Sequence, residues 1–323
     1  MVIIKKLYHI IRIVDSVRKI IITDNKVLTV PTKLPMITKP KPYTLEENGN
    51  VSLGLGGYLN NDIVFTIGLF IDKIGYKYTT KIMVKNNIIN LINGVSSVPY
   101  KINTETLQFI TLIGISKGIV EDINNRDVKD FNLNPYKKIP NKINNNLRSK
   151  LSVIQLENYI LNIAEAYKSV ANIYFPVRLD QRTRLYCLTD LYNYQSNDLA
   201  KSWLSFSNCA TIYKHDTEAI NYLKSYGGWL FDSNMTRKSI NTRVKWTDTN
   251  KDYILGFENN DIVDKADEKA CFLSFCFQYK RLIEFLDNLE ASEFKTNLPI
   301  QLDASCNGYQ HICLLTKEKA LFK

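Results

Sequence analysis

The stretch DKADEKACFLSFCFQYKRLIEFLDNL spans residues 264–289 and is strongly apolar in its middle. Its length and its spacing of apolar residues predict a helix over residues 264–288. A shorter helix is predicted over residues 217–226, and the apolar segment LPIQLDAS at residues 298–305 predicts a short strand. The second half of the chain is therefore expected to have an α+β fold.

The first half of the chain is expected to be mainly helical. Apolar side chains recur at helical spacing over residues 150–173, and residues 103–121 predict another helix with a Thr or Asn cap. Residues 122–150 are rich in Asn and Lys and hold few apolar residues, so they predict a solvated connection. Four prolines exclude a regular helix over residues 31–43. The basic, apolar-periodic residues 1–22 predict either an amphipathic helix or a short pair of strands.

The composition narrows the classes of partner and of site. The 323 residues include 42 Lys and Arg against 32 Asp and Glu, and the net charge of +10 favours nucleic acid or an anionic membrane as a partner. A basic protein without a nucleic-acid role is the alternative. No apolar run approaches the roughly 20 residues that a membrane helix requires. The six cysteines show no C-x-x-C spacing and there are three histidines, so buried free thiols are expected rather than a zinc site.

Asp303, in the segment LDASCNGYQH at residues 302–311, has two interpretations. It follows an apolar strand-like segment, where a carboxylate is a good ligand for a hard cation, and the small residues after it would let a ligand approach the backbone. An Asp between a strand and a helix is also a common helix cap. The residues alone leave both interpretations open.

The segment DQRTRLY, residues 180–186, could form a phosphate-binding surface. Alternate positions of a strand face the same side, which would group two guanidiniums with a carboxylate and a phenol: Arg182, Arg184, Asp180 and Tyr186. Planar guanidiniums bind phosphate through paired hydrogen bonds. An ion-paired surface strand would have the same sequence, so both interpretations stay open.

The segment YNYQSNDLAKSWLSF, residues 192–206, predicts the start of a helix. Polar residues that include Asn197 lead into it, and Lys201 follows one turn later. The free backbone N–H groups of a helix start can bind phosphate, while Asn and Asp are also common helix caps, and both can hold at once. The basic run RKSINTRVK, residues 237–245, is interpreted as a solvated face rather than a site.

Taken together, these segments resemble the phage-type single-subunit DNA-directed RNA polymerases, the family that also serves mitochondria and linear mitochondrial plasmids. DQRTRLY is similar to the family's Asp-x-Arg-Gly-Arg-x-Tyr, and NYQSNDLAK to its Asn-Pro-Gln-Gly-Asn-Asp with a following lysine. FLSFCFQY, residues 272–279, is similar to Phe-Leu-x-Phe-Cys-x-Glu-Tyr, and DASCNGYQH to Asp-Gly-Ser-Cys-Ser-Gly-x-Gln-His. Upstream, LPMITKPKPY and GGYL resemble the family's Leu-Pro-Met…Pro and Gly-Gly-Tyr segments. Thr183 and Ser196 depart from the pattern, because they replace glycines where backbone would meet nucleic acid.

The resemblance implies an α+β, partial right-hand polymerase fold. Residues 1–83 would be the end of an N-terminal region, residues 84–172 a helical thumb-like region, and residues 173–323 a partial palm with the first metal aspartate. The implied activity is template-directed nucleotidyl transfer by a two-metal mechanism with Mg²⁺. A DNA template, an RNA product and ribonucleoside triphosphates would be the partners, no membrane is expected, and the implied location is the mitochondrion.

The resemblance also implies roles for single residues. Asp303 would be the catalytic residue and would bind Mg²⁺ together with the backbone carbonyl of Ala304. The residues expected to contact nucleic acid or nucleotide are Arg182, Arg184, Tyr186, Asn197, Lys201, Gln310 and His311.

The family further requires a second aspartate in an apolar His-Asp hairpin and a fingers helix with Arg, Lys and a Tyr-Gly pair. The 323 residues contain neither, so we expect an incomplete chain that does not polymerise RNA alone, with a missing C-terminal half to supply them. The alternative function is a catalytically inactive relic, or a nucleic-acid-binding fragment, of such a polymerase. A DNA polymerase that shares only the palm fits less well, because Ser-x-x-Glu-like residues follow the aspartate there.

Overall fold

The computed structural model of the chain describes residues 3–4, 11–12, 33–44, 57–58, 86–114, 116–120, 141–179, 184–301 and 315. Its helices are α2 (Asn86–Ser96), α3 (Thr104–Ile113), α5 (Asn141–Tyr167), α6 (Asp198–Ser202), α7 (Thr217–Phe231), the 3₁₀ turn η1 (Ser233–Arg237), α8 (Ile240–Thr249), α9 (Lys251–Leu255), α10 (Ile262–Lys265) and α11 (Lys269–Asp287). Its strands are β1 (Ile3–Ile4), β2 (Ile11–Arg12), β3 (Tyr100–Ile102), β4 (Val177–Leu179), β5 (Leu185–Cys187), β6 (Leu204–Phe206), β7 (Ala210–Ile212) and β8 (Phe294–Thr296).

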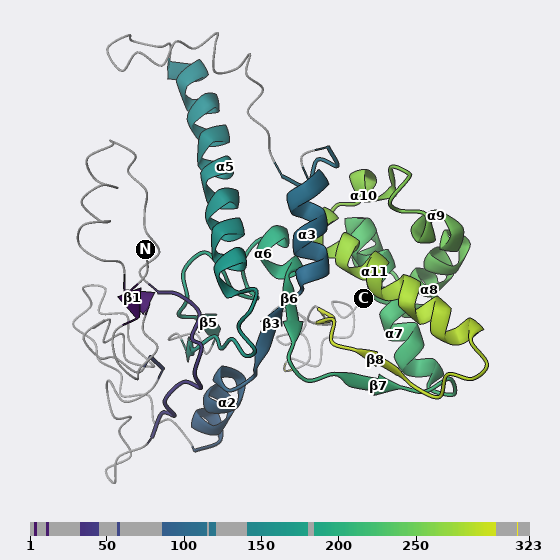
Figure 1. Cartoon of the computed structure of the whole chain (residues 1–323), viewed down its shortest axis with the longest axis horizontal. Coiled ribbons are helices and arrows are strands. Elements are labelled where there is room, and N and C mark those ends of the chain that lie inside the picture. Colours follow the sequence, from purple (N-terminus) through teal and green to yellow (C-terminus); the bar gives the residue numbers. More distant parts are fainter. Residues whose placement is uncertain are drawn as a thin grey trace.

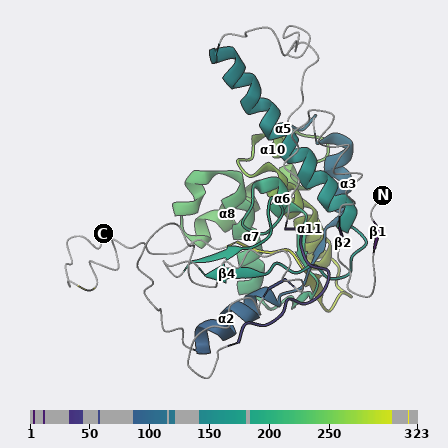
Figure 2. The same ribbon diagram turned by 90° about the vertical axis from the view of Figure 1, so that its left-hand side faces the viewer.

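These elements mix helices with small antiparallel sheets, which confirms the predicted α+β class at this level. The strands pair as β1–β2, β3–β6, β4–β5 and β7–β8. Figure 1 shows α7, α8, α9 and α10 gathered around α11, and in Figure 2, as in Figure 1, the long helix α5 extends away from the other elements. No helix among the described residues combines the length and the apolar character needed to cross a bilayer.

Helix α11 lies at the centre of the main core. Its side chains Phe272, Phe275 and Tyr279 have no exposed surface, and α3, α6, α7, α9 and α10 all contact it. Burying an aromatic side chain of this size stabilises a fold by about 2–3 kcal/mol. The strongly apolar middle of the predicted helix is therefore the part that the core surrounds.

Gly227 allows α7 to lie close to α11. A Cβ atom at this position would lie 2.9 Å from Cε2 of Phe275 and closer still to two other atoms of that ring. Ordinary carbon–carbon contacts are about 3.5–4.0 Å, so no larger residue fits between the two helices without a shift.

The predicted helix over residues 264–288 is divided in the structure, because α10 ends at Lys265 and α11 begins at Lys269. The backbone N–H groups of Asp267 and Glu268 donate to carbonyls at the end of α7, at 3.0 and 3.1 Å. Because these two N–H groups donate to α7, they cannot make the hydrogen bonds along the chain that would join α10 to α11.

Three other helix boundaries differ from the prediction. Asn103 caps α3 as expected, since its side chain accepts from the N–H of Thr106 at 3.3 Å, but the helix ends at Ile113 rather than near residue 121. The predicted solvated connection is wrong over 141–150, because these residues are the first turns of α5. Helix α7 extends to Phe231, beyond the predicted 217–226.

The predicted strand over residues 298–305 is wrong over 298–301, which form no strand. The strand lies earlier, in β8, which pairs with β7. Pro299 has no N–H to donate to a sheet, which gives a physical reason for the strand to end before it. Residues 302–305 lie outside the described part of the chain.

Several N-terminal predictions are confirmed where the structure describes them. The pairing of β1 with β2 is the predicted short pair of strands, and residues 33–44 contain no helix. The hydroxyl of Tyr58 donates to the carbonyl of Leu34 at 2.8 Å, which brings the GGYL and LPMITKPKPY segments together.

The described cysteines are free thiols, as expected. Cys271 and Cys276 are buried and Cys187 is half-buried, but Cys209 is exposed. The expectation of burial is therefore wrong for Cys209, which lies just before the edge strand β7.

Candidate functional site

Gln195 joins the β4–β5 hairpin to the segment before α6. Its side-chain oxygen accepts from the N–H of Cys187 at 2.7 Å, and its Nε2 donates to the carbonyl of Leu185 at 2.8 Å. Arg184 is exposed directly before β5, and Tyr186 is half-buried within that strand. The two segments that the sequence selects as phosphate-binding candidates are thus neighbours in space.

Asn197 caps the short helix α6. Its side chain accepts from the N–H of Ala200 at 3.0 Å, which is the geometry of an N-cap. The departure from the family pattern at Ser196 is accommodated, because its hydroxyl turns back and donates to the carbonyl of Leu191 at 2.8 Å.

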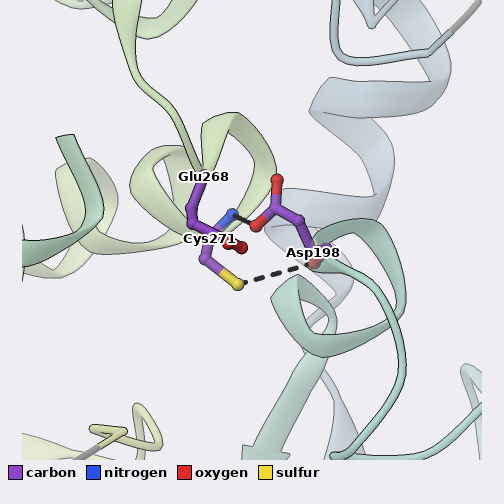
Figure 3. Close-up of side chains that lie close together, drawn as sticks. All are labelled: Asp198, Glu268 and Cys271. Atoms are coloured by element: carbon purple, nitrogen blue, oxygen red, sulfur yellow. Dashed lines mark hydrogen bonds between the residues drawn. The ribbon is translucent and has the colours of Figure 1, made fainter. Parts of the chain in front are cut away.

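Asp198 caps a second helix, α11, from outside that helix. Its carboxylate accepts from the N–H of Ala270 at 2.7 Å. Figure 3 shows its two hydrogen bonds with Cys271: the N–H donates to the carboxylate at 2.9 Å, and the thiol donates to the Asp198 carbonyl at 3.5 Å. Glu268, at the N-cap position of α11, makes no side-chain cap. A carboxylate at a helix N-terminus also offsets the positive end of the helix dipole, so Asp198 fixes α6 to the start of α11.

Lys201 points from α6 toward the segment that leads to Asp303. Its ammonium lies 3.6 Å from Oε2 of Glu268 and 3.5 Å from Oε1 of Gln301, and 17% of its side chain is exposed. Gln301 directly precedes the LDASCNGYQH segment in the sequence. Sequence reasoning selected Lys201 and placed Asp198 at the polar start of its helix, but it predicted neither the contact of Asp198 with α11 nor those of Lys201 with Glu268 and Gln301.

The surroundings of Glu268 change its acidity. Burial raises the pKa of the Glu268 carboxyl, the nearby Asp198 carboxylate raises it further, and the Lys201 ammonium opposes both. Burial also raises the pKa of the Cys271 thiol well above its ordinary value, so this thiol is protonated at neutral pH.

A pocket of about 190 Å³ lies beside these residues. Its wall includes the rings of Tyr100, Tyr194 and Tyr226, together with Lys201 and Gln301. The pocket therefore connects α6, α7 and α11 with the segment before Asp303.

The ligand atoms of Asp198, Glu268 and Cys271 all lie within 4.8 Å of one another, which raises the question of a metal site. Mg²⁺ prefers oxygen ligands, but both carboxylate oxygens of Asp198 accept backbone hydrogen bonds and Cys271 offers a protonated thiol. The Lys201 ammonium lies beside Glu268 as well. These contacts fit a helix cap and an ion pair, and they do not fit Mg²⁺.

The other predicted site residues lie outside the described part of the chain. They are Arg182, Asp303, Ala304, Gln310 and His311. Their roles stay predictions, as do the nucleic-acid contacts predicted for Arg184, Tyr186, Asn197 and Lys201.

Comparison with known proteins gives consistent likenesses. The family described as DNA-dependent RNA polymerase matches residues 214–321. A Podospora anserina protein named Probable DNA-directed RNA polymerase is 39% identical over 95% of this chain and 31% of its own length. The Schizosaccharomyces pombe protein named DNA-directed RNA polymerase, mitochondrial, is 27% identical over 88% of this chain and 25% of its own length. T7 RNA polymerase of Escherichia phage T7 is 24% identical over 90% of this chain and 33% of its own length.

The chain thus spans between 25% and 33% of the length of these curated relatives, while nearly all of it takes part in the match. The family match over residues 214–321 includes the segments FLSFCFQY and DASCNGYQH. The chain is therefore similar to DNA-directed RNA polymerases over nearly all of its length, and the family model matches about its last third.

Proposed function

We propose that the chain forms part of an enzyme that performs template-directed nucleotidyl transfer, as a DNA-directed RNA polymerase. The observation that carries the proposal is the 39% identity, over 95% of the chain, to a protein named Probable DNA-directed RNA polymerase. The net charge of +10 supports a polyanionic partner. We further propose a right-hand arrangement, with residues 84–172 as a thumb-like region and residues 173–323 as part of the palm.

The proposal assigns roles to the residues around α6. Arg184 and Tyr186 would contact the nucleic-acid backbone from the β4–β5 hairpin, with Arg182 beside them, and Lys201 would contact phosphate from α6. Gln195 supports this assignment, because it holds the hairpin next to the segment that begins α6. Asn197 would act through its cap, by fixing the direction of the helix that carries Lys201.

The reacting groups would lie in the segment that follows Gln301. Asp303 would be the catalytic residue, and its carboxylate with the carbonyl of Ala304 would hold Mg²⁺. A bound Mg²⁺ would supply positive charge to the phosphate oxygens of the reaction. Gln310 and His311 would contact nucleotide or nucleic acid. The partners would be a DNA template, an RNA product and ribonucleoside triphosphates.

The mitochondrion is the proposed location. One relative, from Schizosaccharomyces pombe, carries the word mitochondrial in its name. Fractionation of the source cells, with detection of the chain by mass spectrometry, would test this location directly.

Binding to an RNA–DNA hybrid at several salt concentrations tests the nucleic-acid role. Arg184→Ala is expected to weaken binding and to reduce the slope of log affinity against log salt by about one. Arg281→Ala is the matched control, since Arg281 is exposed and pairs with Glu105 away from the pocket. No binding by the unmodified chain, or equal losses in the two variants, would contradict the proposal.

The role of Asp303 can be tested without a complete reaction. Fe²⁺ bound in place of Mg²⁺ reduces added hydrogen peroxide to hydroxide and hydroxyl radicals, which are expected to cleave a bound hybrid near the RNA 3′ end. Asp303→Asn is expected to abolish this cleavage while hybrid binding persists. Binding with no Asp303-dependent cleavage would instead favour a nucleic-acid-binding module without catalysis.

A further inference from the structure

The Lys201 ammonium is held between two partners without a tight bond to either. Hydrogen bonds between an ammonium and a carboxylate are usually about 2.7–2.9 Å long. Here the nitrogen lies 3.6 Å from the Glu268 carboxylate and 3.5 Å from the Gln301 amide oxygen. The side chain is 17% exposed, so its surroundings rather than solvent decide where the charge lies.

The side chain of Glu268 is 40% exposed, and Lys201 is its ion-pair partner. Its Oε2 is buried and has no hydrogen-bond partner among the described residues. The neighbouring Asp198 carries the same charge, its oxygens accept from the α11 amides, and its proximity raises the pKa of Glu268. The nearest opposite charge in the described part of the chain is the Lys201 ammonium.

We propose that Glu268 is a positioning residue for Lys201. The Glu268 carboxylate holds the Lys201 ammonium in the pocket beside Gln301, and it competes with nucleic-acid phosphate for that ammonium. This inference rests on the proposed function, in which Lys201 contacts phosphate. A phosphate must draw the ammonium away from Glu268, and the long contact allows this exchange because it forms no short hydrogen bond. Binding of phosphate at Lys201 is therefore coupled to the charge of Glu268.

The competition predicts that a variant without the Glu268 charge has a more reactive Lys201 and binds a hybrid more tightly. Glu268→Gln keeps the shape of the side chain but removes the charge that attracts Lys201. Asp248→Asn is the matched control, because Asp248 pairs at 2.7 Å with Lys224, whose side chain is also 17% exposed. Both variants remove one negative charge, but only the first frees the cation beside Gln301.

The first measurement follows the reactivity of single lysines. The purified full chain is treated with a trace of an amine-acylating reagent, and each lysine is quantified by mass spectrometry. Glu268→Gln is expected to raise the acylation rate of Lys201 several-fold without changing Lys224, and Asp248→Asn is expected to do the reverse. An unchanged rate at Lys201 in folded Glu268→Gln would overturn the positioning role.

The second measurement follows binding of an RNA–DNA hybrid as salt is varied. Glu268→Gln is expected to bind several-fold more tightly at low salt, with a salt slope steeper by up to about one, because one more cation can meet a phosphate. In the Lys201→Met background the same change is expected to have no more effect than Asp248→Asn. Equal effects of Glu268→Gln and Asp248→Asn would overturn the competition.

The two measurements separate this inference from the function on which it rests. If the unmodified chain binds no hybrid, the proposed function fails and the competition fails with it, while the acylation rates still show whether Glu268 holds Lys201. Should Glu268→Gln not fold, Glu268→Asp replaces it, since a carboxylate one methylene shorter is also expected to loosen the contact and raise the acylation rate of Lys201.

Discussion

Replacement of Gly227 by alanine is expected to destabilise the chain, although alanine favours helices more than glycine does. The added Cβ would lie 2.9 Å from Cε2 of Phe275 and closer to two other ring atoms, against an ordinary contact of about 3.5–4.0 Å. Phe275 is fully buried, and its ring centroid lies 5.7 Å from that of Phe272 and 5.4 Å from that of Tyr279. The ring therefore cannot move without displacing its neighbours.

The expected net loss is about 2 kcal/mol. Overpacking of a core costs about 1–3 kcal/mol, and the short distances at Gly227 place this substitution at the upper end of that range. The higher helix propensity of alanine offsets about 1 kcal/mol of this cost. Urea denaturation of the purified chain, followed by circular dichroism, measures the difference.

A control in another helix gives the opposite sign. Gly94 lies in α2, and a Cβ there would meet no atom within 4 Å, so Gly94→Ala is expected to stabilise by up to about 1 kcal/mol. Phe275→Leu should restore part of the loss in Gly227→Ala by making room for the methyl group. A Gly227→Ala variant as stable as the unmodified chain would refute the reasoning about the contact between α7 and α11.

Three further predictions concern the site and its thiols. Asp198→Ala is expected to lower the free energy of unfolding, measured with urea, by about 2–3 kcal/mol, because two α11 amides lose their acceptor. Asn197→Ala removes one cap bond and should lower it by about 1 kcal/mol. Equal losses in the two variants would contradict this reasoning. Among the described cysteines, exposed Cys209 is expected to react first with a thiol reagent. Half-buried Cys187, whose pKa burial raises to about 12, should react more slowly, and mass spectrometry decides the order. Glu268 faces Asp198, Lys201 and Cys271, and burial raises its pKa above the ordinary 4.5. The folded chain therefore binds this proton more tightly than the unfolded chain does, and the stability gained in this way is lost as pH rises through the raised pKa. The stability of Glu268→Gln relative to the unmodified chain is therefore expected to grow from pH 4.5 to neutrality, and a difference independent of pH would contradict this.

Features that depend on neighbouring residues were predictable from the sequence. Asn103 caps α3 and Asn197 begins α6, because an Asn side chain bonds an amide only a few residues away. The short strands of the β4–β5 hairpin and the buried middle of α11 follow from residue type and spacing in the same way. The break between α10 and α11 was not predictable from local pattern, because it is set by hydrogen bonds from the amides of Asp267 and Glu268 to α7.

The same distinction between local sequence and tertiary contacts holds for the residues of the candidate site. The sequence by itself selected Asn197, Lys201 and the segment around Asp303, through residue types and their order along the chain. Only the tertiary structure decided that Asp198 caps a helix whose amides lie 72 and 73 residues away, and that Lys201 lies between Glu268 and Gln301. Spacing along the chain carries no information about which distant amide or carboxylate meets a side chain. That choice is made when the apolar faces of α6, α7 and α11 are buried together.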